Sequence, residues 1–109
     1  MLSAVENAFQ KHFDHIALEA KGEVVQILAD DTEDVPHQRF IFRCPSGQTV
    51  LVAHNLDRAK RIPVSLGDAI SLKGMYVWNE KGGLIHETHA DAVEGNFNGW
   101  IKLNEVKYA

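Results

Sequence analysis

The chain has 109 residues, of which 45% are hydrophobic and 24% are charged, so it suits one globular domain and excludes a disordered or fibrous protein. Its net charge of −4 disfavours unspecific nucleic-acid binding, because the phosphate backbone is itself anionic. The single Cys44 excludes an internal disulfide, and no apolar run approaches the ~18 residues that a membrane-spanning helix needs.

The N-terminal segment has the pattern of an amphipathic helix. Ser3 and Glu6 are spaced as in a capping box, where each side chain satisfies a free backbone donor at a helix start. Apolar residues then recur at helical spacing as far as Ile16. We therefore expect a helix over about residues 3–16 that packs by its apolar stripe against the rest of the domain.

The next segments read as β-strands. The period changes at Gly22, and the β-branched run that follows predicts a first strand that ends in the acidic residues 30–34. We interpret those carboxylates as a solvated turn, because the glycine and the ligand spacing of a calcium loop are missing. Residues 39–44 and 49–55 then form a hairpin around a turn that begins with Pro45.

The second half of the chain continues the pattern. Pro63 limits the preceding residues 56–61 to one helical turn. Residues 69–77 alternate as a strand, in which Gly74 predicts a bulge or bend. After the glycine turn, residues 84–89 form the fifth strand, and residues 100–103 add an edge strand or pack as a tail.

These elements predict an all-β fold with one N-terminal helix, organised as a small five-stranded OB-like antiparallel barrel. Residues 1–109 form a single domain, with the helix at about 3–16 and the barrel at about 21–103. In such a barrel, ligands meet the face of the second and third strands and the loops that border it. The acidic loop at that entrance again disfavours unspecific nucleic-acid binding.

Four of the six histidines lie in or at the ends of predicted strands. Strand ends converge at a barrel rim, so His37, His54 and the residues from His86 to Asp91 are expected to meet there. Three interpretations stay open: a metal site, a buried hydrogen-bonded histidine network, and a polar ligand site without metal. On a regular strand His86 and Thr88 share one face, while His89 points to the other unless the strand ends before it.

The leading hypothesis is a non-enzymatic OB-like module that binds a small polar ligand or a protein segment at this rim. Its predicted ligand-binding residues are His37, Arg39, His54, Asn55, His86, Thr88 and His89. A metal-dependent hydrolase acting on a phosphoester is the first alternative. A divalent metal such as zinc would then bind His86, His89 and Asp91.

In that hydrolase, Glu87 or Asp91 would act as the base and Arg39 would stabilise developing charge. No complete catalytic motif decides whether the protein is an enzyme. The second alternative is a structural or interaction protein that forms a homodimer through an open strand edge.

Several strings resemble one family closely. These are His37-Gln38-Arg39-Phe40-Ile41, Ser46-Gly47-Gln48-Thr49, Ala53-His54-Asn55-Leu56-Asp57, Gly82-Gly83-Leu84-Ile85-His86-Glu87-Thr88-His89 and Gly99-Trp100-Ile101-Lys102. Over about Val5 to Tyr108 the chain resembles a bacterial family of small proteins catalogued as the domain of unknown function numbered 3465. The resemblance implies an OB-like barrel and supplies no activity.

The resemblance also bears on the compartment and on the histidines. Relatives with a secretion signal imply an extracytoplasmic setting, so a mature form would be periplasmic or secreted. Taken literally, an N-terminus without a signal-peptide pattern predicts a cytoplasmic protein. The family string is closer to tryptophan at Glu87 and to histidine at Ala90, so a metal ligand at position 90 is not expected here.

Overall fold

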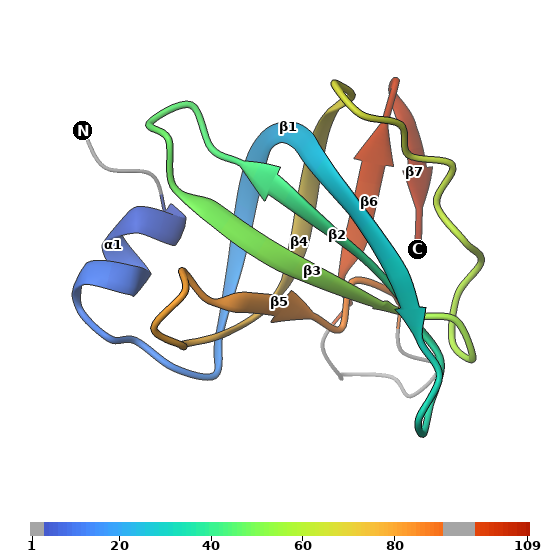
Figure 1. Ribbon diagram of the computed structural model, residues 1–109, viewed down its shortest axis with the longest axis horizontal. Coiled ribbons are helices and arrows are strands. Elements are labelled where there is room, and N and C mark those ends of the chain that lie inside the picture. The colour runs from blue at the N-terminus through green and yellow to red at the C-terminus, as the bar shows by residue number, and fades with distance from the viewer. Residues whose placement is uncertain (1–3, 91–97) are drawn as a thin grey trace.

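The computed structural model describes residues 4–90 and 98–109 (Figure 1). Within them the chain is mostly β, with one short helix and a seven-stranded sheet. The elements are α1 (Ala4–Gln10), β1 (Ile16–Asp31), β2 (His37–Arg43), β3 (Thr49–Asn55), β4 (Ala69–Val77), β5 (Leu84–His86), β6 (Trp100–Leu103) and β7 (Val106–Tyr108).

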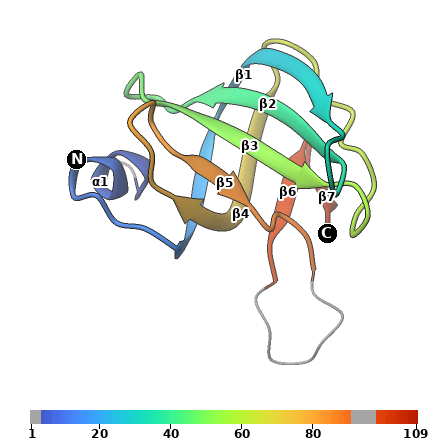
Figure 2. The same ribbon diagram turned by 60° about the horizontal axis from the view of Figure 1, so that its bottom comes forward.

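Five of these strands form a closed ring of pairings. The order in the sheet is β1-β2-β3-β5-β4-β6-β7, and β1 also pairs with β4. Strand β1 is long enough to serve both partners, with residues 16–23 along β4 and residues 23–31 along β2. All pairings are antiparallel except β3 with β5, which run in the same direction (Figure 2). The β6–β7 hairpin extends the sheet from β4.

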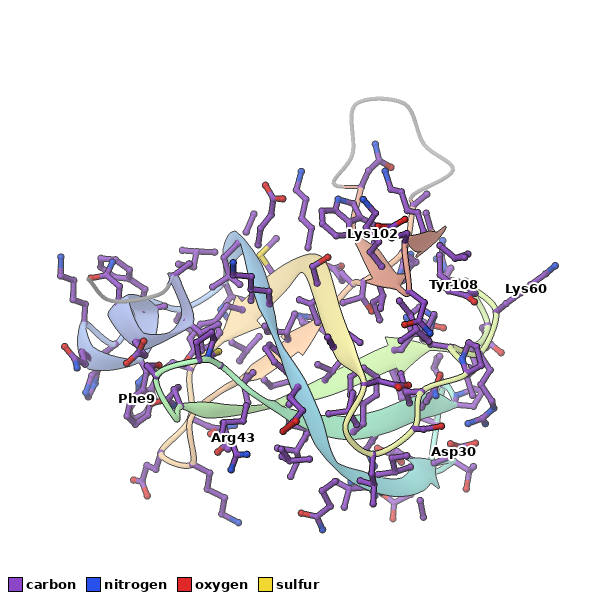
Figure 3. All side chains as sticks on the ribbon, turned by 90° about the horizontal axis from the view of Figure 1, so that it is seen from above. Phe9, Asp30, Arg43, Lys60, Lys102 and Tyr108 are labelled. Carbon is purple, nitrogen blue, oxygen red and sulfur yellow. The ribbon has the colours of Figure 1, made fainter. Side chains whose placement is uncertain are left out.

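The ring encloses the core because alternate residues of its strands are apolar. In β3 and β4, Val50, Val52, Ile70 and Leu72 are buried, and their chain neighbours are partly exposed. Side chains fill the space between the strands (Figure 3). The predicted strands at 49–55 and 69–77 are confirmed to the residue.

The helix is shorter than predicted. It ends at Gln10, and Ile16 already begins β1, so the expectation of a helix up to residue 16 is wrong. His12 adopts a left-handed backbone with φ 54°, which ends the helix. The indole of Trp78 stacks on the His12 ring at 4.2 Å and donates a hydrogen bond to the carbonyl of Phe9 at 3.0 Å. Ile16, the last residue of the apolar helical pattern, is therefore the first residue of a strand.

Two further details of the sheet differ from the sequence prediction. Strand β4 pairs with β1 in unbroken register through Gly74, so of the predicted bulge or bend the bulge is wrong and the bend stays a prediction. The irregularities lie instead in β1 against β2, between Val24 and Gln26 and beyond Leu28. The added strand at 100–103 is confirmed as β6, whereas β7 was not predicted.

Within residues 4–90 and 98–109, no helix is long and apolar enough to cross a membrane.

Candidate functional site

A buried polar cluster lies beneath the ends of β2 and β3. The side chain of His54 has no exposed surface. Its Nε2 lies 2.9 Å from the carbonyl oxygen of Lys60, and its Nδ1 lies 2.8 Å from the hydroxyl of Thr88. Burial has the largest effect on the pKa of His54 and lowers it, which favours the neutral ring. A carbonyl only accepts, so in the neutral ring Nε2 carries the proton and Nδ1 accepts from the hydroxyl.

The buried side chain of Gln38, opposite His54 in the register, holds the same loop. Its amide donates to the carbonyl of Ile62 at 2.7 Å and accepts from the N–H of Ile62 at 2.8 Å. Together, Gln38 and His54 satisfy backbone groups of residues 60–62 where no strand pairs with them. We call Gln38 and His54, together with the Thr88 hydroxyl that bonds to His54, the clamp, because they hold the loop at residues 60–62 in place.

A backbone kink at Glu87 separates His86 from Thr88. Ile85 faces the core, so His86 points outward, and a regular strand would carry Thr88 outward as well. Instead β5 ends at His86, and Glu87 takes a left-handed conformation with φ 55°. Thr88 is consequently fully buried, where it reaches His54. The expectation that His86 and Thr88 share one face is wrong.

Two glycines make room for this kinked segment. A Cβ on Gly99 would lie 2.1 Å from the carbonyl oxygen of Glu87, and one on Gly74 would lie 2.9 Å from the methyl group of Thr88. The N–H of Gly99 also donates to the carbonyl of His89 at 2.9 Å. The close approach of Gly74 in β4 and of Gly99, just before β6, to residues 87–89 thus holds the kink in place.

Above the clamp lies a polar hollow of about 190 Å³. We call it the histidine hollow, and it forms where β2 begins and where β3 and β5 end. Its lining side chains are His37, Asn55, Arg58, His86, Glu87 and His89.

Several lining groups have donor or acceptor atoms that make no hydrogen bond among the described residues. The Nδ1 atoms of His37 and His89 lie 2.8 and 3.1 Å from backbone carbonyls, so each Nδ1 donates, and each Nε2 makes no hydrogen bond among the described residues. The side-chain oxygen of Asn55 accepts from the N–H groups of Asp57 and Arg58, which leaves its NH2 group as a donor. The hollow therefore offers both donors and acceptors.

The most unusual atom of the hollow belongs to His86. Its Nε2 is buried and has no hydrogen-bond partner among the described residues. Burial lowers the pKa of His86, the Glu87 carboxylate opposes that shift, and the neighbouring histidines reinforce it. The net effect favours the neutral ring, and its Nε2 is held away from solvent.

The predicted site residues separate into three groups. His37, Asn55, His86 and His89 meet in the histidine hollow, while His54 and Thr88 lie in the clamp beneath it. Arg39 is not among the lining side chains, because its Nε donates to the carbonyl of Ala29 at 3.0 Å along the β1–β2 pair.

The hollow also contains residues that the prediction placed elsewhere. Arg58 lies three residues before Arg61 in the chain, but the two diverge, because Arg61 pairs with Asp30 and lowers the pKa of that carboxyl. Glu87 had been considered only as a base. The Asn55 cap on the turn at Asp57 and Arg58 is the sequence signal that brings Arg58 toward the rim.

The predicted metal ligands are His86, His89 and Asp91. Asp91 lies outside the described residues, so this set stays a prediction. Within residues 4–90 and 98–109, no three His, Cys, Asp or Glu side chains converge closely enough to hold a metal ion. The homodimer also stays a prediction, although β7 has a strand neighbour on one side only within this part of the chain.

Comparison with known proteins gives a family and no activity. The model of the family described as "Protein of unknown function (DUF3465)" matches residues 2–109. No curated protein matches this chain.

Proposed function

This chain belongs to the DUF3465 family of proteins of unknown function, and we propose from its geometry that it is a single-domain, OB-like binding module. Its histidine hollow holds a small polar ligand. The ring of β1, β2, β3, β5 and β4 supports the OB-like assignment, because five strands paired in a closed circuit match that barrel. The two extra strands extend the circuit from β4.

The observation that carries this proposal is the unpartnered Nε2 of His86. Buried polar atoms in native proteins almost always have hydrogen-bond partners, because an unmet one costs about 1–3 kcal/mol. The Nε2 atom has no accessible surface, and the His86 side chain lines the polar hollow that three histidines share. A rotation of the His86 ring would bring this atom to a ligand in the hollow, which would supply the missing partner.

The lining groups define the chemistry of the ligand. The Arg58 guanidinium and the Asn55 amide are donors suited to a carboxylate, and the Glu87 carboxylate is an acceptor suited to a hydroxyl or amine. A hollow of about 190 Å³ is smaller than a drug-sized pocket. We therefore infer a small hydroxy or amino acid as the ligand class, with glycolate and glycine as its simplest probes.

The left-handed Glu87 fits this function. A non-glycine residue with φ 55° is held in a sparsely populated conformation, and such residues gather at ligand sites. Here the kink places His86 and His89 at the same hollow while Thr88 turns into the clamp. The clamp lies beneath the histidine hollow and holds in place the residues on which the ligand would rest.

Titration of the labelled protein with glycolate and glycine, followed by backbone amide NMR, tests the proposal. We expect saturable shifts confined to residues around the histidine hollow, and we expect His86→Ala to abolish them. The matched control is Arg39→Ala, which removes a cation outside the hollow and should leave binding unchanged. Shifts in neither titration, or equal loss in both variants, would remove the hollow as the site.

A further inference from the structure

A row of lysines crosses the outer face of the sheet away from the histidine hollow. Lys21 of β1 pairs in register with Ser71 of β4, Ser71 pairs with Lys102 of β6, and Lys102 pairs with Lys107 of β7. Neighbouring strands lie about 4.8 Å apart, so the backbones of Lys21 and Lys102 flank Ser71 at roughly 10 Å from each other. Two flexible lysine side chains thus start on either side of one serine on the same face of the sheet.

This arrangement is unfavourable for the fold alone. Lys102 and Lys107 face each other directly, and like charges at that position destabilise a sheet. Lys107 turns to the indole of Trp100, with its Nζ 5.6 Å from the ring centroid. Of the two lysines, Lys102 is therefore the one that borders the hollow beside Lys21 and Ser71.

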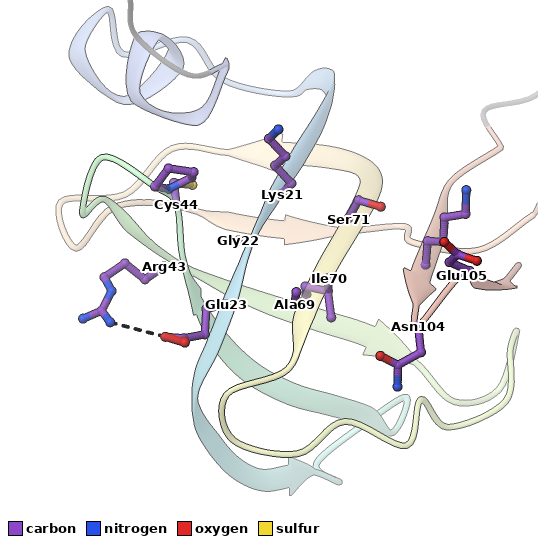
Figure 4. Close-up of a pocket in the computed structure, with 12 residues that line it drawn as sticks. Lys21, Gly22, Glu23, Arg43, Cys44, Ala69, Ile70, Ser71, Asn104 and Glu105 are labelled. Atoms are coloured by element: carbon purple, nitrogen blue, oxygen red, sulfur yellow. Dashed lines mark hydrogen bonds and ion pairs between the residues drawn. The ribbon is translucent and has the colours of Figure 1, made fainter.

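Lys21, Ser71 and Lys102 line one open hollow of about 700 Å³, which we call the lysine hollow (Figure 4). Arg43 and Glu23 line it as well, and they form an ion pair at 3.4 Å, so their charges offset each other. The turn between β6 and β7 forms the opposite wall and brings the carboxylate of Glu105. The lysine hollow shares no lining residue with the histidine hollow.

We propose that the lysine hollow binds the phosphate group of a small phosphomonoester. A phosphate carries close to two negative charges at neutral pH and offers three acceptor oxygens. Lysine binds phosphate as a point charge, and a serine hydroxyl adds a directed donor. Lys21, Ser71 and Lys102 supply these groups at one place. A volume of about 700 Å³ lies within the range of small-molecule sites, so the organic part fits beside the phosphate.

The charges around the row favour a single phosphate over a nucleic-acid strand. Glu19 and Glu23 flank Lys21 on the same face of β1, and the whole chain has a net charge of −4. Alternate residues of a strand share one face, so Glu19 and Glu23 lie beside the β1 end of the row, where Arg43 already pairs with Glu23. A nucleic-acid strand that followed β1 would meet the Glu19 carboxylate, whereas a single phosphate needs only the groups at Lys21, Ser71 and Lys102.

Calorimetric titration with phenyl phosphate, using phenol as the uncharged control ligand, tests this site. We expect saturable binding of phenyl phosphate and none of phenol. Lys21→Gln and Lys102→Gln should each weaken binding by about fivefold, the upper range for an exposed charge pair. Glu105→Gln should tighten binding by about twofold, because a repelling carboxylate is removed. Lys81→Gln, an exposed lysine in the turn after β4, should leave binding unchanged.

Three outcomes would overturn the proposal. The first is no saturable binding of phenyl phosphate by the folded wild-type protein. The second is equal weakening in Lys81→Gln and Lys102→Gln, which would mean that only total charge matters. The third is tighter binding of a ten-nucleotide oligothymidine than of phenyl phosphate with the same lysine dependence, which would assign the row to a nucleic acid. None of these outcomes depends on the histidine hollow.

Discussion

His54 and His86 lie on neighbouring strands, and burial lowers the pKa of both, yet their surroundings differ. Both ring nitrogens of His54 have partners inside the chain. His86 has a buried Nε2 with no partner among the described residues. A fully satisfied buried histidine stabilises the fold, whereas an unsatisfied one at a hollow points to a partner from outside. Within one histidine-rich region, His54 thus stabilises the fold, and His86 is the residue that we propose to bind the ligand.

The largest expected effect is that of His54→Ala. The substitution leaves the Lys60 carbonyl and the Thr88 hydroxyl without their partner and opens a cavity, so the free energy of unfolding should fall by about 3 kcal/mol. Urea denaturation measures this change. The matched control is His15→Ala, which alters an exposed histidine and should change stability by less than about 0.5 kcal/mol. A stable His54→Ala protein would show that the clamp is dispensable.

Thr88→Val isolates one hydrogen bond of the clamp. Valine keeps the shape of threonine but leaves the Nδ1 of His54 without a donor, so a loss of about 1–2 kcal/mol in unfolding free energy is expected. Thr88→Ser retains the hydroxyl and should lose less than Thr88→Val. Equal losses in the two variants would attribute the effect to packing of the methyl group.

Stability should also depend on pH through His54. Its pKa in the folded protein lies below the ordinary value for histidine, which is about 6.5, so the unfolded chain takes up a proton first as pH falls. Stability is therefore complete above about pH 6.5 and declines as the pH falls toward the folded pKa. Denaturation curves between pH 7.5 and 5.5 measure the slope, and His54→Gln should flatten it. An unchanged slope in that variant would assign the dependence to another group.

The smallest expected effect on stability is that of His86→Ala. Removing a side chain whose buried nitrogen has no described partner sacrifices no hydrogen bond, so the free energy of unfolding should stay within about 0.5 kcal/mol of the wild type. Urea denaturation beside His54→Ala gives the direct contrast. A loss as large as that of His54→Ala would make His86 a structural residue too.

Much of the sheet was predictable because alternation encodes it. Val50, Val52 and His54 alternate in β3, so the pattern is consistent with a buried His54, although His54 was predicted as a ligand-binding residue of the rim. The end of α1 was missed because apolar residues continued at helical spacing into β1. Strand β7 was missed because its turn is Asn104-Glu105, both with positive φ, and a glutamate there carries no turn signal.

The candidate site was predictable only in part. Convergence of strand ends brought His37, Asn55 and His86 together as expected. The burial of Thr88 was not predictable, because it depends on a left-handed Glu87 that only the close approach of Gly99 and Gly74 makes possible. The place of Arg39 depended on the irregular β1–β2 register, which brings the Ala29 carbonyl within its reach.

A long-range proton–nitrogen NMR spectrum of the histidine rings, recorded during titration with glycolate, tests most directly whether His86 binds the ligand while His54 is structural. We expect His54 to keep its proton on Nε2 and not to respond, while the Nε2 resonance of His86 shifts saturably as a partner reaches it. A silent His86, or a response of His54 as large as that of His86, would contradict the division between clamp and binding site.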